Sequence, residues 1–200
     1  WRLASAVNAS WLYGSAKLVD ACSEQEVTLY AALSGNGFVQ VISGEWIPLQ
    51  ASLIKTASFF AVGGFNPLIT QGEDRELCQR IALQGNFAAT PATVAIIRRE
   101  GARTAVYPEG IQQTRREREK LLNQPRAFGR MRASATSAYW RGRLVRTYLA
   151  SMLWNLQQGK VITALSRALY GVLGVFLSAL YLVSPEFWRA LVASHQSKVI

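Results

Sequence analysis

Two short motifs, a glycine turn and a pair of carboxylates, could together form a site for acid–base chemistry. Gly63-Gly64-Phe65 predicts a sharp turn, because glycine adopts backbone conformations that are closed to other residues. Eight residues after Phe65, Glu73 and Asp74 stand together at the predicted start of a helix. Free amide groups at a helix N-terminus favour ionised carboxylates. A carboxylate fixed at the edge of a cleft can serve as a general base.

The stretch from Gly44 to Ala105 resembles the second half of the catalytic domain of family-two glycosyltransferases, which are inverting enzymes with the GT-A fold. The resemblance is carried by the order and spacing of the Gly-Gly-Phe turn, the Glu-Asp pair, Leu77, Arg80 and Gly85-Asn86-Phe87. It implies an α/β fold and the transfer of a sugar, with inversion, from a nucleotide-sugar to a glycan or lipid-linked acceptor. Such an enzyme would act in the synthesis of cell-surface polysaccharide or glycolipid.

The resemblance also implies roles for individual residues. Asp74 matches the catalytic base, and Glu73 matches a residue that orients the base or the acceptor. For both carboxylates, stabilisation of the helix N-terminus is the alternative. Gly63, Gly64 and Phe65 match the turn that lines the acceptor pocket, with a tight structural turn and a buried Phe65 as the alternative.

Further residues are candidates for substrate binding, and two of them have a structural alternative. Trp46 could stack on a sugar ring or belong to the core. Arg80 could offset charge in the cleft or form a structural ion pair. Arg99 or Arg103 could hold the donor diphosphate through charge-assisted hydrogen bonds.

The metal site of the family has no clear counterpart in this sequence. The only aspartates are Asp20 and Asp74, so the Asp-x-Asp motif that holds the metal and the donor diphosphate is missing. We expect the donor-binding half to lie outside this chain, to bind most of a divalent cation (Mg²⁺ or Mn²⁺), and to leave this fragment inactive alone. Glu100 is the candidate ligand here. The single histidine, His195, is expected to be a solvated tail residue.

The composition predicts two regions. Residues 1–107 are expected to be the acceptor side of the transferase domain, and residues 108–200 a basic α-helical region. Expected strands are 9–19, broken at Gly14, then 38–42 and 93–97. Expected helices are 2–8, 23–34 in part, 55–61, 73–84 with a cap at Gly85, 111–122, 127–158 and 161–183, the last ended by Pro185.

The charge of the chain predicts an anionic partner. The net charge is +10, and the segment from Arg98 to Arg146 holds 13 Lys/Arg against 4 Glu. Acidic lipid headgroups or phosphates suit such a segment, as does a solvated helix face. No nucleic-acid-binding motif is present, so we expect no nucleic-acid partner.

The tail from Ala168 to Pro185 carries no formal charge and has one apolar face. A helix lying on a membrane surface, a helix packed on the protein and a membrane span are the three interpretations. The two cysteines, Cys22 and Cys78, are typical of reduced thiols. Together these features favour a cytoplasmic location at the inner face of the cell membrane. The alternative function is a membrane-surface or partner-binding module on a non-catalytic transferase-like scaffold.

Overall fold

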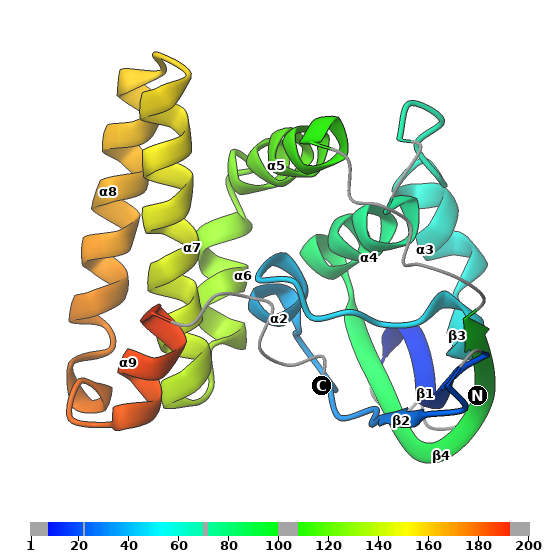
Figure 1. Cartoon of the computed structure of the whole chain (residues 1–200). Coiled ribbons are helices and arrows are strands. Elements are labelled where there is room, and N and C mark those ends of the chain that lie inside the picture. Colours follow the sequence, from blue (N-terminus) through cyan, green and yellow to red (C-terminus); the bar gives the residue numbers. More distant parts are fainter. Residues whose placement is uncertain (1–7, 22, 70–71, 100–107, 193–200) are drawn as a thin grey trace. The chain divides into compact units, whose positions relative to one another are not determined.

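A computed structural model describes residues 8–21, 23–69, 72–99 and 108–192 (Figure 1). The fold is mixed α/β, and the described chain divides into two compact units. The first unit contains the residues up to Gly37 and those from Trp46 to Leu121. The second contains Phe38–Glu45 and the residues from Leu122 onward. The division expected at residue 107 lies outside the described residues, as does the helix expected at 2–8.

The first unit is built on a small mixed sheet whose central strand is β1 (Ala9–Asp20). β4 (Asn86–Arg99) pairs with β1 in parallel along its whole length. β2 (Glu26–Leu29) and β3 (Ser52–Ile54) pair antiparallel with different halves of β1, so they share its other edge. The helix expected in part of 23–34 was therefore wrong for Glu26–Leu29. These four residues pair with β1 as a strand.

β1 does not break at Gly14, and β4 is longer than the strand expected at 93–97. The register between the two strands shifts where Gly14 pairs with Thr90 and Ser15 pairs with Thr93. Pro91 lies in this irregularity, where its missing N–H costs no ladder bond. A Cβ on Gly14 would lie 2.6 Å from the Val94 side chain. Glycine is therefore needed here for close strand approach, and it does not end the strand.

Helices complete the first unit. η1 (Leu49–Ala51) and β3 precede α3 (Thr56–Ala61), which confirms the helix expected at 55–61. α4 (Glu73–Gln84) begins and ends where the sequence predicted, with Gly85 as its C-cap. It buries Leu77 and Ile81. α5 (Pro108–Leu122) confirms the charged helix.

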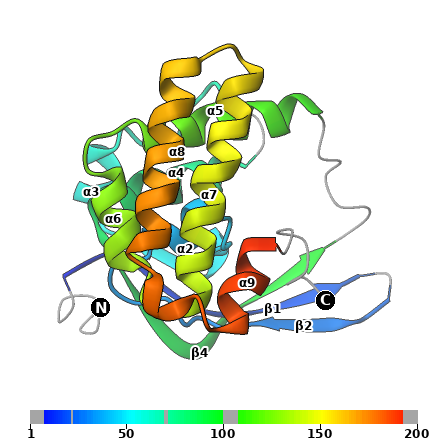
Figure 2. The ribbon, with the colours of Figure 1, turned by 90° about the vertical axis from the view of Figure 1, so that its left-hand side faces the viewer.

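The second unit is helical. α6 (Ala127–Ser134), α7 (Ala138–Gln157) and α8 (Val161–Phe176) are followed by η2 (Ala179–Tyr181) and α9 (Pro185–Val192). α7 and α8 lie side by side (Figure 2). The single helix expected at 127–158 is two helices, because the side chain of Ser137 caps a new start at α7. The helix expected at 161–183 ends at Phe176, so Pro185 does not end it. Pro185 begins α9, since proline is well tolerated in a first turn.

The strand expected at 38–42 was also wrong, because these residues form helix α2 (Phe38–Ile42). All five of its side chains are buried. A short, mostly apolar run such as this one, interrupted only by Gln40, does not distinguish a strand from a buried helix. The Val39 N–H donates to the Ser134 Oγ at 2.9 Å, and this distant side chain satisfies an amide at the helix start. None of the described helices combines the length and the apolar character needed to cross a membrane.

Candidate functional site

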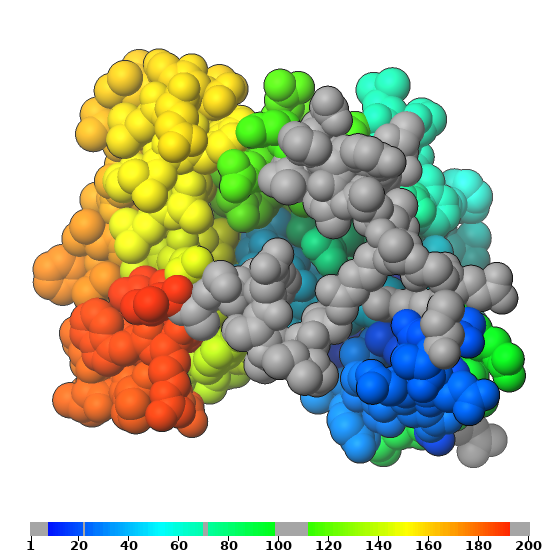
Figure 3. All heavy atoms as spheres, in the orientation of Figure 1, coloured from blue at the N-terminus to red at the C-terminus, as the bar shows by residue number. Residues whose placement is uncertain are grey.

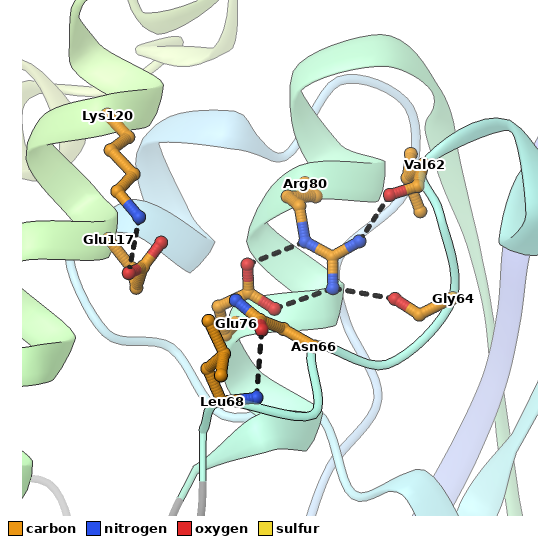
Figure 4. Close-up of polar contacts among 8 residues, drawn as sticks. All are labelled: Val62, Gly64, Asn66, Leu68, Glu76, Arg80, Glu117 and Lys120. Carbon is orange, nitrogen blue, oxygen red and sulfur yellow. Dashed lines mark hydrogen bonds and ion pairs between the residues drawn. The ribbon is translucent and has the colours of Figure 1, made fainter.

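The turn predicted at Gly63-Gly64 is present, and its carbonyls are held by Arg80 (Figure 4). Both glycines have positive φ, at 84° and 67°, a region that other residues rarely adopt. The Arg80 guanidinium donates to the Gly64 carbonyl at 2.7 Å and to the Val62 carbonyl. Arg80 lies on α4, so this side chain ties the turn to the helix that carries the acidic pair.

The same guanidinium forms a two-pronged ion pair with Glu76 (Figure 4). Both N–H···O distances are 2.6 Å, and the Arg80 and Glu76 side chains are only 18% and 8% exposed. Paired, nearly parallel hydrogen bonds of this kind fix geometry as well as charge. The structural ion pair considered for Arg80 is thus present, and the guanidinium is occupied by protein acceptors. Any substrate role of Arg80 would act through the position of the turn.

Asp74 lies in the first turn of α4 and accepts two hydrogen bonds. Its Oδ2 accepts from the Trp46 indole N–H at 3.2 Å, and its Oδ1 accepts from the Arg75 backbone N–H at 2.7 Å. The carboxylate is half-buried, and Gly72 before it has φ 75° and offers no side-chain cap. Each oxygen keeps a second acceptor position. Asp74 is therefore oriented by its neighbours while still able to take a proton.

Three other candidates differ in what they offer to a ligand. Glu73 is exposed and directly precedes Asp74. Phe65 is 42% exposed, so the buried ring considered for it was wrong. Its ring meets the Phe59 ring in an edge-to-face arrangement, with 5.6 Å between the ring centroids. Trp46 is half-buried, and its indole N–H is held by Asp74, so the ring is neither fully core nor free to turn.

A shallow hollow lies against the side of α4, within the first unit. α5 contributes to its wall, and the Gln113 amide donates to the Leu68 carbonyl at 2.5 Å. The lining side chains are mostly polar and include both charges: Ile69, Gly72, Arg75, Glu76, Gln79, Gln113, Thr114 and Glu117. The sequence analysis did not predict that α5 residues line this hollow. A helix with so many charged residues is normally solvent-exposed along its length.

Cys78 is the buried thiol of α4, one turn after Asp74. Burial raises its pKa far above the usual range, and the negative charge of Asp74 adds to that rise while Arg75 opposes it. The thiol therefore stays protonated and inert at neutral pH. It is a packing residue and offers no nucleophile to the site.

The described residues do not provide a site for the divalent cation that the sequence led us to expect. No three Asp, Glu, His or Cys side chains gather in the described ranges. Glu76, the third carboxylate in the first turn of α4, is bound to Arg80. Glu100, Arg103 and His195 lie outside the described residues, and so does the side chain of Arg99, whose backbone ends β4.

No family model, no curated protein and no solved structure matches this chain.

Proposed function

We propose that this chain carries the acceptor side of an inverting glycosyltransferase, with Asp74 as the general base. The donor would be a nucleotide-sugar, and the acceptor a glycan or a lipid-linked glycan. The observation that carries the proposal is the Trp46–Asp74 hydrogen bond. The bond fixes the direction of a half-buried carboxylate in the first turn of α4, the helix whose Arg80 also holds the Gly63-Gly64 turn.

The proposed reaction needs one chemical group from this chain, a carboxylate that accepts a proton. The acceptor hydroxyl oxygen attacks the anomeric carbon of the donor sugar, and its proton passes to a free position on the Asp74 carboxylate. The new C–O bond forms as the bond to the diphosphate breaks, and the nucleoside diphosphate leaves with the electron pair. Attack from the opposite face inverts the configuration. Positioning contributes most to such a step, because the hydroxyl becomes acidic only as the bond forms.

Other residues would bind and orient the acceptor. Glu73 is exposed next to Asp74 and can accept from a second hydroxyl. Phe65 presents part of an aromatic face, which suits the apolar side of a sugar ring. The chain has no Asp-x-Asp motif. We therefore propose that the donor diphosphate and its Mg²⁺ or Mn²⁺ are bound mainly by residues outside this chain.

The test is sugar transfer by a protein that contains this chain together with a donor-binding half, measured across a panel of nucleotide-sugars. Asp74→Asn keeps the side-chain shape and one of the two accepting oxygens. It should lower kcat by about 10²–10⁴-fold with donor binding retained. Glu73→Gln is the comparison variant: it removes a neighbouring charge and alters one acceptor contact but leaves the base, so kcat should fall far less than in Asp74→Asn. Equal kcat for wild type and Asp74→Asn would refute the assignment.

One observation favours a second candidate, a binding module on a non-catalytic scaffold. The two hydrogen bonds that Asp74 accepts, with its place in the first turn of α4, also suit a carboxylate that only stabilises the helix. In that case Asp74→Asn would lower stability and leave binding of a partner intact. Thermal unfolding measured beside transfer distinguishes the two functions.

A further inference from the structure

Helix α8 has its large apolar side chains on the outside and its small or polar side chains on the inside. The outward residues recur every three or four positions: Ile162, Leu165, Leu169, Val172, Leu173 and Phe176. Ile162 is 86% exposed and Phe176 is 73% exposed. Beyond the helix, Leu180 and Val183 are 89% and 90% exposed. We call these eight residues the α8 stripe; Figure 3 shows α8 (orange) at the surface beside α7 (yellow).

The inward face of α8 packs closely on α7 through small residues. Gly171 and Gly174 are buried, and a Cβ on Gly174 would lie 2.7 Å from the Leu144 side chain. Arg167, the single charge between Val161 and Ser184, also points inward and donates to the Ser151 hydroxyl at 3.1 Å. Helices that meet through small and polar residues, with leucines turned outward, are typical of packing in a lipid environment. In water, a helix normally turns its apolar stripe inward.

The second unit that carries the stripe is strongly cationic. Its described residues include nine Arg and Lys but only two acidic side chains, Glu45 and Glu186. Arg126, Arg132, Lys160 and Arg189 are exposed. Anionic lipid headgroups attract such a unit, and each basic residue near the surface adds to that attraction. A second copy of the chain suits the stripe less well, because each copy carries a net charge of +10.

We propose that the α8 stripe inserts into the surface of an anionic lipid bilayer. At 16 residues, α8 is about 24 Å long, shorter than the ~30 Å hydrocarbon core, so the helix lies in the interface and does not cross it. Trp188, which follows on α9 and is 50% exposed, suits the headgroup level. This surface does not depend on the proposed sugar transfer, and either can fail alone.

The test is co-sedimentation of the chain with vesicles of phosphatidylcholine, with and without phosphatidylglycerol. Leu169→Glu and Phe176→Glu place a charge in the centre of the stripe at exposed positions, so the fold should survive. Gln124→Glu is the control, since it adds the same charge to the same unit. Its neighbour Asn123 contacts Arg167 on the inward side of α8, away from the stripe. Circular dichroism and thermal unfolding verify that each variant is folded.

We expect the wild type and Gln124→Glu to sediment with phosphatidylglycerol vesicles, and each stripe variant to lose roughly tenfold in affinity. Wild-type binding should weaken without phosphatidylglycerol. Absence of vesicle binding, or equal binding by folded stripe variants, would overturn the proposal. Light scattering without lipid gives the other decisive result. A wild-type dimer that both stripe variants convert to monomers would assign the stripe to a second copy.

Discussion

The Trp46 indole and the Asp74 carboxylate, 28 residues apart, are joined by a 3.2 Å hydrogen bond. The bond links the loop after α2 to the first turn of α4 within the first unit. A tryptophan N–H can only donate, and the Asp74 Oδ2 atom accepts from it. The pair therefore fixes the direction of the Asp74 carboxylate, which is what either a base or a helix-stabilising residue requires.

Replacing Trp46 with phenylalanine should destabilise the first unit by about 1–3 kcal/mol, because a hydrogen bond to a charged group is lost at a half-buried site. The measurement is the free energy of unfolding in urea. In a double-mutant cycle, Trp46→Phe and Asp74→Asn should show a coupling of about 0.5–3 kcal/mol. Trp188→Phe is the matched control, since its indole donates to the Leu182 carbonyl at an exposed site. Additive effects of Trp46→Phe and Asp74→Asn would show that the hydrogen bond contributes nothing in solution.

Glu76→Gln should destabilise the first unit by about 3 kcal/mol, because it leaves the guanidinium of Arg80 without its charged partner at a mostly buried site. The Gly63-Gly64 turn should loosen as well, since the same guanidinium holds its carbonyls. Urea unfolding gives the first effect, and faster amide hydrogen exchange around Gly64 gives the second.

The exposed ion pair between Lys17 and Glu26 is the control for the loss of stability predicted for Glu76→Gln. Its side chains are 43% and 54% exposed, and the N···O distance is 3.2 Å. Glu26→Gln should therefore cost no more than about 1 kcal/mol, since exposed pairs are screened by water and salt. Similar losses for the two variants would contradict the structural role assigned to Glu76.

Gly14→Ala should destabilise the sheet by about 1–3 kcal/mol, because the new methyl group would overlap Val94 and the Ala92 carbonyl. Gly129→Ala in α6 is the matched control: a Cβ there meets nothing within 4 Å. That change should stabilise its helix by about 0.5–1 kcal/mol through better helix propensity. Thermal unfolding of both variants checks the opposite signs. A neutral Gly14→Ala would show that the strands separate there at little cost.

The sequence predicted the parts of the fold that depend on local signals. α4 is bounded by Gly72 and Gly85, and its apolar residues repeat at helical spacing, so its limits could be read directly. α2 could not, because five buried residues in a row fit either structure and its start is capped by Ser134, about a hundred residues away. The continuation of β1 through Gly14 depends equally on β4, a partner distant in the chain.

The candidate site, too, has features that the sequence predicts and contacts that it does not. The Gly63-Gly64 turn and the position of Asp74 follow from local spacing. Neither the Trp46–Asp74 bond nor the Arg80–Gly64 bond could be predicted, because spacing does not show which side chains meet across loops. The sequence analysis did not single out Glu76 for a related reason. Its role comes from its burial against Arg80. From sequence alone, a third acidic residue in the first turn of a helix suggests only an interaction with the helix dipole.

Cys78 makes stability depend on pH above the usual range for thiols. Burial raises its folded-state pKa, so the unfolded chain, with a thiol pKa near ~8.5, loses its proton first as pH rises. The stabilising contribution is complete below pH ~8.5 and declines above it by up to about 1.4 kcal/mol per pH unit. The free energy of unfolding, measured in urea at pH values from 7 to ~10, should decline with this slope in addition to the contributions of other titrating groups. Cys78→Ala should remove it, and identical slopes for the two proteins would show that the thiol is accessible to water.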